Sequence, residues 1–289
     1  LQHAHSLADA QRIIEGATVF VSDILVVADG KTGQARVFEK SPARTAFYDV
    51  SESAALANEL TTPVFADDLV NRSRIADSTT HQRLTRAREL LNGLHQRVTP
   101  EGLAGLLRDK SGLGGKPLGW GNRNAIDGLI ACHSVIIDVT SGQMWVAGWP
   151  NAEGAFVGTD VLATLEELAR NRERADTNFV ASASPPVIGP DNILVDGTWP
   201  RILAAREAAD RAVAALKRRD PSVALEESQR VIANNPAFYL GHELKGRALF
   251  ARGDKAAAKL ELQKALAADP PYTSRRDDIE ELINQCDVH

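Results

Sequence analysis

A repeat of 34 residues near the C-terminal end is the feature that most constrains the fold of this chain. Residues 222–239 align with residues 256–273, and the identical pairs include Ala224 with Ala258, Gln229 with Gln263, and Pro236 with Pro270. The sequence after Pro200 has helical patterning throughout. A short helical repeat buries its apolar face only against neighbouring repeats, so this region is expected to form a stack of paired helices.

The repeat resembles the tetratricopeptide repeat. Gly246, Ala258, Ala265 and Pro270 occupy the small-residue and terminal-proline positions of that motif, while His242 replaces its usual Trp. Small residues at these positions let paired helices approach closely. One full repeat, half of another and a final helix make a short array, which is expected to pack against the preceding domain or to hold a protein partner.

The residues before the repeats show blocks of strands and helices. A helix is expected near the start, where Leu7, Ala10 and Ile14 recur at helical spacing, and two β-branched runs joined across Asp29 and Gly30 predict a hairpin. The other expected elements are strands over 44–50 and 53–60, helices over 77–96 and 99–111, and a second hairpin over 129–149. Such blocks predict an α+β fold with antiparallel sheet, rather than βαβ units.

Three parts are therefore expected along the chain. Residues 1–171 form the α+β domain, residues 172–200 form a polar linker or wrapping segment with four prolines, and residues 201–289 form the helical domain.

Composition excludes several classes of function. The formal net charge is −5, with 33 basic and 38 acidic residues, and no basic stripe would attract nucleic acid. No apolar run approaches the roughly 18 residues needed to span a bilayer. The seven histidines show no zinc spacing, so neither a metal nor a cofactor is predicted.

The Gly-rich loop over 112–122 is not a phosphate-binding P-loop. Pro117 follows Gly115-Lys116 where the P-loop needs Ser or Thr, and proline has no backbone N–H. The loop is expected to be a plain connector, or a flexible loop that carries Trp120 near a pocket.

Cys132 and His133 are adjacent and invite comparison with a catalytic dyad. Within a strand, successive side chains point to opposite faces, so the pair is expected to diverge and to serve core or structural roles. The other cysteine, Cys286, lies in the helical domain, and a disulfide framework is not predicted.

Arg83 is expected to turn inward. On a helical wheel it lies roughly 45° from the centre of the leucine stripe, whereas Arg86 and Arg88 lie about 100° away. A buried guanidinium needs an anionic or carbonyl partner, which a structural salt bridge would also provide. Asn58 follows a strand candidate, where asparagine commonly caps or turns.

Several segments together resemble the acyl-coenzyme A:6-aminopenicillanic acid acyltransferase family, which consists of autoproteolytic cysteine enzymes of the N-terminal nucleophile hydrolase superfamily. The resemblance covers residues 1 to about 165 and rests on the order of six segments: "SLADAQRIIE", "ILVVADGKTGQARVFEKSPAR", "LANELTTPVF", "DSTTHQRLTRARELL", "TPEGLAGLLRDKSG" and "HSVIIDVTSGQMWVAG".

The resemblance implies an α/β/β/α antiparallel sandwich, present here in part, and a cysteine nucleophile whose own amino group is the general base. It implies that Asn58 donates a hydrogen bond to the oxyanion and that Arg83 is an active-site arginine. The family's nucleophilic cysteine would lie upstream of Leu1, so the native N-terminus is expected to be missing and the compartment, cytoplasmic or exported, stays open.

Two functions are carried forward from the sequence. The first is an acyltransferase or amide hydrolase acting on a small-molecule acyl donor or amide, to which this chain supplies Asn58 and Arg83. The second is a non-catalytic scaffold whose C-terminal helices bind a protein partner.

Overall fold

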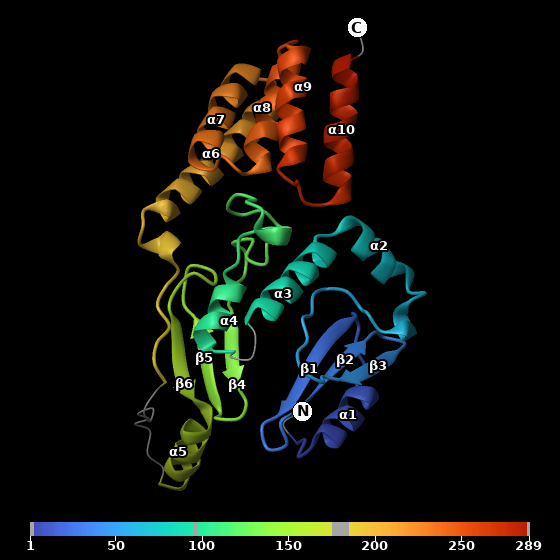
Figure 1. The fold of residues 1–289 in the computed structure, drawn as a ribbon, viewed down its shortest axis with the longest axis vertical. Helices are drawn as coiled ribbons and strands as arrows, with labels where there is room; N and C mark the ends of the chain where they lie inside the picture. The colour runs from blue at the N-terminus through green and yellow to red at the C-terminus, as the bar shows by residue number, and fades with distance from the viewer. Residues whose placement is uncertain (1–2, 95–97, 175–184, 288–289) are drawn as a thin grey trace.

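The structure, a computed structural model, describes residues 3–94, 98–174 and 185–287. Two antiparallel sheets of three strands each are followed by a region of about five packed helices. Figure 1 shows the sheets side by side, with the helical region stacked beyond one end of both. The expected α+β class is confirmed at this level.

The first sheet has the strand order β1-β2-β3 and carries a helix on one face. Its elements are α1 (Leu7–Gly16), β1 (Asp23–Asp29), β2 (Gln34–Lys40) and β3 (Thr45–Asp49). Ser6 caps α1 by accepting a hydrogen bond from the Asp9 N–H, and Lys40 Nζ of β2 donates to the Glu15 carbonyl of α1 at 3.3 Å. The expected first helix, first hairpin and strand over 44–50 are confirmed.

The strand expected over 53–60 is wrong, because no β-strand forms there. Side chains satisfy the adjoining backbone instead of a neighbouring strand. The Leu60 N–H donates to Asn71 Oδ1 at 3.0 Å, and the N–H groups of Thr61 and Thr62 donate to the buried carboxylate of Glu39 at 2.6 and 2.9 Å. This segment is therefore a loop that side-chain hydrogen bonds hold in place at its end.

Helices connect the two sheets. They are η1 (Pro63–Phe65), α2 (Leu69–Asp77), α3 (Thr80–Leu94) and α4 (Pro100–Leu107). Helix α2 was not anticipated, α4 ends before the expected Ser111, and residues 95–96 of the expected second helix lie outside the described residues. Thr99 caps α4 through the Gly102 N–H, as expected from the Thr-Pro-Glu sequence.

The second sheet has the strand order β4-β5-β6. It consists of β4 (Val135–Asp138), β5 (Gln143–Ala147) and β6 (Phe156–Asp160), and β6 leads directly into α5 (Val161–Arg174). The core on one face contains Ile136, Trp145 and Phe156, packed against Ala104 of α4. The second hairpin is confirmed, although its first strand begins later than expected.

The proposed linker over 172–200 is structured where it is described. Helix α5 extends to Arg174, Ile188 pairs with Phe156 at the edge of β6, and a short helix η3 (Asn192–Leu194) precedes α6. Residues 175–184 lie outside the described part of the chain.

The helical region contains α6 (Thr198–Lys217), α7 (Pro221–Asn234), α8 (Tyr239–Ala251), α9 (Lys255–Ala267) and α10 (Thr273–Asp287). The repeated segments form α7 and α9, and the equivalent residues Asp220 and Asp254 cap them. A Cβ at Gly246 would lie 2.6 Å from Cγ of Leu262, so the small residue is required where α8 and α9 touch.

The Gly-rich loop joins the helical region to the rest of the molecule. The Trp120 N–H donates to Asn235 Oδ1 at 3.1 Å, and Asn235 Nδ2 donates to the Trp120 carbonyl at 2.9 Å. The buried amides of Asn122 and Asn124 each donate to the Asp269 carbonyl at 3.0 Å. The loop is thus not a plain connector, because it docks on the turns that follow α7 and α9, and Trp120 lies at a pocket as the alternative expected.

Gly119→Ala is expected to weaken this docking. Gly119 has a φ of +73°, and its Cβ would lie 2.5 Å from the Phe238 backbone nitrogen. Gly121→Ala is a matched control, because its φ is +89° but no atom lies within 4 Å of its Cβ. The left-handed backbone should lower the free energy of unfolding of both variants by about 1–2 kcal/mol, and the clash should lower that of Gly119→Ala further. Thermal unfolding measures the difference. Equal losses would contradict the contact.

Candidate functional site

Asn58 and Arg83 come from different segments and are hydrogen-bonded to each other. Arg83, in the first turn of α3, donates from Nη2 to Asn58 Oδ1 at 2.9 Å. The hydroxyls of Thr79, at 3.2 Å from Nε, and Thr80, at 3.4 Å from Nη2, also accept hydrogen bonds from Arg83. The acceptor that the inward arginine required is therefore an amide oxygen. The other two acceptors are hydroxyl groups, so none of the three is a carboxylate.

This hydrogen bond fixes the orientation of the Asn58 side chain. A guanidinium only donates, so the atom of Asn58 that faces Arg83 is the amide oxygen. The amide nitrogen is then the group left to donate elsewhere. Asn58 is exposed, so its NH2 group is available to a carbonyl or oxyanion of a bound molecule.

A cavity of about 470 Å³ lies beside this pair, and Asn58 and Arg83 line it. Strand β1 forms one wall through Ile24 and Val26, and α2 contributes Arg74. This volume is within the range of about 300–1,000 Å³ that is typical of small-molecule pockets. The lining is mixed, because apolar residues of β1 and the 53–60 segment alternate with polar and charged residues, among them Asp23, Asp68 and Asn71.

Arg83 has charged neighbours of both signs. Burial lowers its pKa most, and Arg123 nearby lowers it further, whereas Tyr272 and Glu59 oppose this shift. Glu59 is buried, its Oε1 lies 3.8 Å from His81 Nδ1, and its Oε2 has no hydrogen-bond partner among the described residues. The site thus also contains a buried carboxylate that the sequence did not indicate.

The helical region approaches this site through the start of α10. Thr273 Oγ1 donates to the Ala76 carbonyl at 2.7 Å, and the Ser274 N–H donates to Asp77 Oδ1 at 2.8 Å. These contacts are at the end of α2, directly before the threonines that hold Arg83. The position of Arg83 therefore depends on the helical region as well as on α3.

Arg86 is more buried than the helical wheel predicted. Its side chain is 12% exposed and forms a bidentate pair with Asp109, at 2.9 and 3.0 Å. The wheel placed Arg86 on the flank of α3, but the chain after α4 returns over that flank and covers it. Asp109 is the largest contributor to a raised pKa of Arg86, so the pair is a structural salt bridge.

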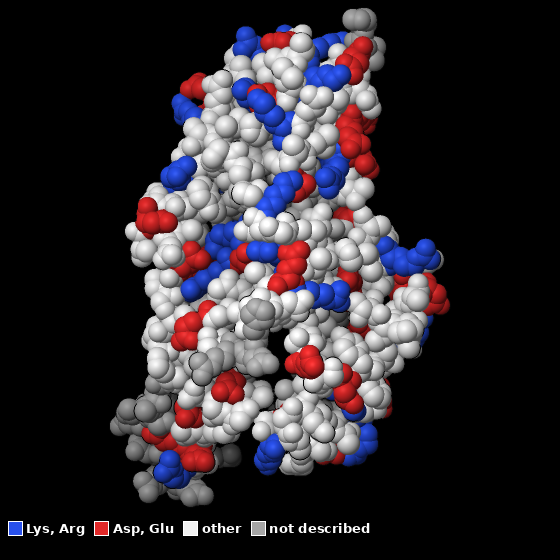
Figure 2. Space-filling model, viewed as in Figure 1, with Lys and Arg blue, Asp and Glu red and all other residues white. Residues whose placement is uncertain are grey.

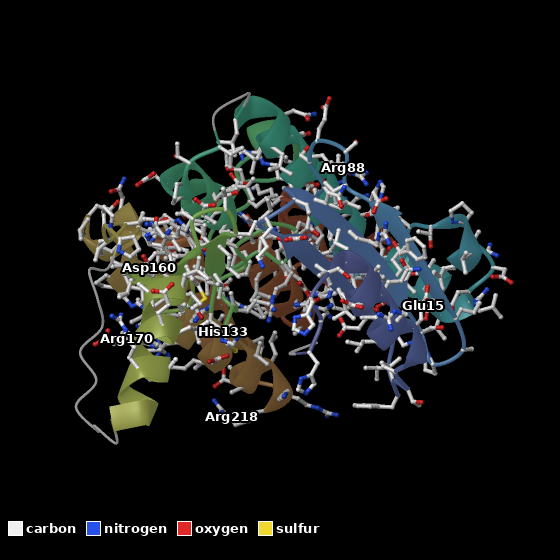
Figure 3. All side chains as sticks on the ribbon, turned by 90° about the horizontal axis from the view of Figure 1, so that it is seen from below. Glu15, Arg88, His133, Asp160, Arg170 and Arg218 are labelled. Carbon is white, nitrogen blue, oxygen red and sulfur yellow. The ribbon has the colours of Figure 1, made fainter. Side chains whose placement is uncertain are left out.

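Cys132 and His133 do not occupy the positions that were expected. Both are exposed and precede β4 in an irregular segment, so the expectation of core roles is wrong and strand geometry does not set their directions. No hydrogen bond joins the two side chains. Figure 3 labels His133, which precedes β4, and Asp160, at the end of β6.

Cys132→Ser is expected to leave folding unchanged. An exposed side chain without a specific contact contributes little, so the free energy of unfolding should change by less than about 0.5 kcal/mol. Thermal unfolding under reducing conditions measures this change. A larger loss would show that the thiol is packed in the folded protein.

A second polar cluster was missed by the sequence analysis and is more deeply buried. Lys110 Nζ lies 3.0 Å from Glu153 Oε2, 3.1 Å from Asp191 Oδ2 and 3.3 Å from Asp127 Oδ2. The four residues are far apart in sequence, and no local pattern marks them. Burial, followed by hydrogen bonding to Asp127, raises the pKa of Glu153 to about 9.

Within the described part of the chain, no group of three or more His, Cys, Asp or Glu side chains is arranged to hold a metal ion. None of the described helices has both the length and the apolar character that a bilayer crossing requires.

Comparison with known proteins adds no relative. No protein-family model matches the chain, and no curated protein sequence is significantly similar to it.

Proposed function

We propose that this chain is part of a cysteine N-terminal nucleophile acyltransferase or amide hydrolase. The nucleophilic cysteine would come from residues outside the present sequence. In this proposal its thiolate attacks an amide or thioester carbonyl, Asn58 donates from Nδ2 to the resulting oxyanion, and Arg83 holds Asn58 in position. The substrate is a small-molecule acyl donor or amide in the cavity beside them.

The observation that carries this proposal is the hydrogen bond from Arg83 to Asn58 at 2.9 Å. It leaves the amide NH2 group of an exposed asparagine free at the wall of a cavity. An oxyanion donor needs this preorganisation, because a donor that must reorient during the reaction stabilises the transition state less.

The uncovered face of the second sheet also supports the proposal. Val135, Val146 and Val157 are direct neighbours across the three strands and are 42%, 36% and 57% exposed. Helix α4 covers the opposite face. In the proposed α/β/β/α sandwich, this row of valines would pack against further β-structure.

The edges of the two sheets fit the same arrangement. Within the described residues, β1 and β4 each pair with one strand, so each is an edge strand. Figure 2 shows a hollow between the lobes that contain the two sheets. The β1–β2 turn and the β4–β5 turn are in contact, since a Cβ at Gly30 would lie 1.9 Å from the Val139 carbonyl oxygen. Additional strands in this hollow would extend both sheets, and we propose that the segment carrying the nucleophile lies there.

The scaffold function is less well supported. The loop that carries Trp120 docks on the turns of the repeat helices, so part of the surface that a protein partner would use is occupied within the molecule.

Substitutions in the product of the whole gene test the proposed function. Asn58→Ala is expected to lower kcat toward a chromogenic acyl-amide substrate by about 10²–10³-fold, and Arg83→Met to lower it less, because Arg83 acts through Asn58. Arg72→Gln, an exposed arginine of α2 that does not line the cavity, is the matched control and is expected to retain activity. Full activity in Asn58→Ala, or a gene product without an upstream cysteine that forms an acyl adduct, would refute the proposal.

A further inference from the structure

A second pocket lies where the Gly-rich loop meets the helical region. It has a volume of about 350 Å³ and is lined by Trp120 and Arg123 of the loop, by Ile202 and Ala205 of α6, and by Phe238 before α8. Helix α6 supplies one wall and the loop supplies the other. The pocket is separate from the cavity beside Asn58, because the two share no lining residue.

The aromatic wall of this pocket is fixed in place before any ligand binds. Asn235 is 3% exposed and holds both the N–H and the carbonyl of Trp120. Arg201 lies over the Trp120 ring, with its Cζ 5.4 Å from the ring centroid. A rigid aromatic side chain loses little conformational entropy on binding, so Trp120 is suited to pack against an apolar ligand.

Arg123 gives the pocket an unbalanced positive charge. This guanidinium is half-buried and has no hydrogen bond or salt bridge within the described part of the molecule. Its charged neighbours include Arg83, which repels it. Arg206 also lines the pocket and donates to the Leu129 carbonyl at 2.9 Å, while the acidic lining residue, Asp210, is exposed.

A partly buried cation without an acceptor is stabilised by an anion that enters the pocket. The apolar wall of Trp120, Ile202 and Phe238 favours a hydrocarbon body on that anion. The two requirements together describe an amphipathic carboxylate, such as a medium-chain fatty acid.

We propose that this pocket binds a small amphipathic carboxylate, with the carboxylate on Arg123 and the apolar chain against Trp120 and α6. The proposal does not depend on the acyl-transfer activity. The volume of about 350 Å³ is near the lower end for small-molecule sites, so the occupant is a small molecule rather than a protein segment.

Binding of octanoate to the protein tests the proposal by isothermal titration calorimetry. Saturable binding is expected, and Arg123→Gln should weaken it by about tenfold or more, the usual effect of losing a charge-assisted hydrogen bond. Arg218→Gln is the matched control, because this exposed arginine follows the far end of α6 and is labelled in Figure 3. It should bind octanoate as the parent protein does.

Octanamide separates the charge of the ligand from its chain. The parent protein should bind octanamide at least about tenfold more weakly than octanoate, and Arg123→Gln should bind the two equally. Unfolding curves of the two arginine variants must match that of the parent protein. Lack of saturable binding, equal binding of octanoate by Arg123→Gln and Arg218→Gln, or binding only of peptides with a free C-terminal carboxylate would overturn the proposal.

Discussion

Lys110→Met is expected to destabilise the protein by about 3–5 kcal/mol, the usual cost of leaving buried charges without their counterion. Lys110 is 14% exposed and faces three carboxylates, of which Glu153 is 0% and Asp127 is 1% exposed. Methionine has a similar length and no charge. The variant therefore keeps the packing volume but leaves the carboxylates without a hydrogen-bonded ammonium group, and denaturant unfolding at pH 7 measures the loss.

Lys264→Met provides the control for Lys110→Met. Lys264 is 57% exposed and pairs with Glu261, which retains His242 and Lys245 as partners. Loss of this ion pair should lower the free energy of unfolding by less than about 1 kcal/mol. If the two variants were equally stable, Lys110 would contribute no more to the free energy of unfolding than an exposed lysine does.

Glu153→Gln is expected to remove a pH dependence from the stability of the protein. The folded-state pKa of Glu153 is raised to about 9, so the folded protein keeps this carboxyl protonated while the unfolded chain ionises it at its ordinary pKa. The parent protein therefore loses stability as the pH rises from about 4.5 to 9, with a slope of up to about 1.4 kcal/mol per pH unit. Above pH 9 the dependence levels off.

The Gln variant should lack this slope, since an amide does not titrate. Denaturant unfolding at several pH values between 5 and 9 measures the difference between the parent protein and the variant. It should grow in favour of the variant as the pH rises. A difference that shrinks with rising pH would show that Glu153 is ionised in the folded protein and stabilises it through Lys110.

Two buried oxygen atoms support the protonated state of Glu153. Glu153 Oε1 and Asp127 Oδ2 have no hydrogen-bond partner among the described residues when both groups are ionised. One proton shared between the two carboxyls would satisfy both atoms. The same proton would lower the charge around Lys110 by one unit.

The elements that the sequence predicted correctly depend on local signals. Ser6 and Thr99 mark helix starts by capping, and the glycine turns mark both hairpins. The error over 53–60 has a non-local cause, because distant side chains bind the backbone where this segment ends: Asn71 of α2 accepts from the Leu60 N–H, and Glu39 of β2 accepts from the two residues that follow. A strand pattern cannot show which distant group will accept its hydrogen bonds.

The candidate site was predictable only in part. Asn58 and Arg83 were chosen from the family resemblance and the helical wheel, and the structure brings them into hydrogen-bond contact, while their catalytic roles stay predictions. The Lys110 cluster could not be predicted, since its members come from four separated segments. Arg123 was missed for the same reason, because its lack of a counterion is a property of the assembled junction.

The docking of the Gly-rich loop requires a fixed spacing between two turns of the helical array. Asn235, which binds Trp120, and Asp269, which binds Asn122, are 34 residues apart and so occupy equivalent turns of successive repeats. The distance between the two anchors is then set by the repeat itself. Insertion of a repeat unit between them would separate the anchors beyond the reach of the loop, whereas growth of the array beyond α10 would leave them in place. Repeats could thus be added after α10 but not between the two anchors.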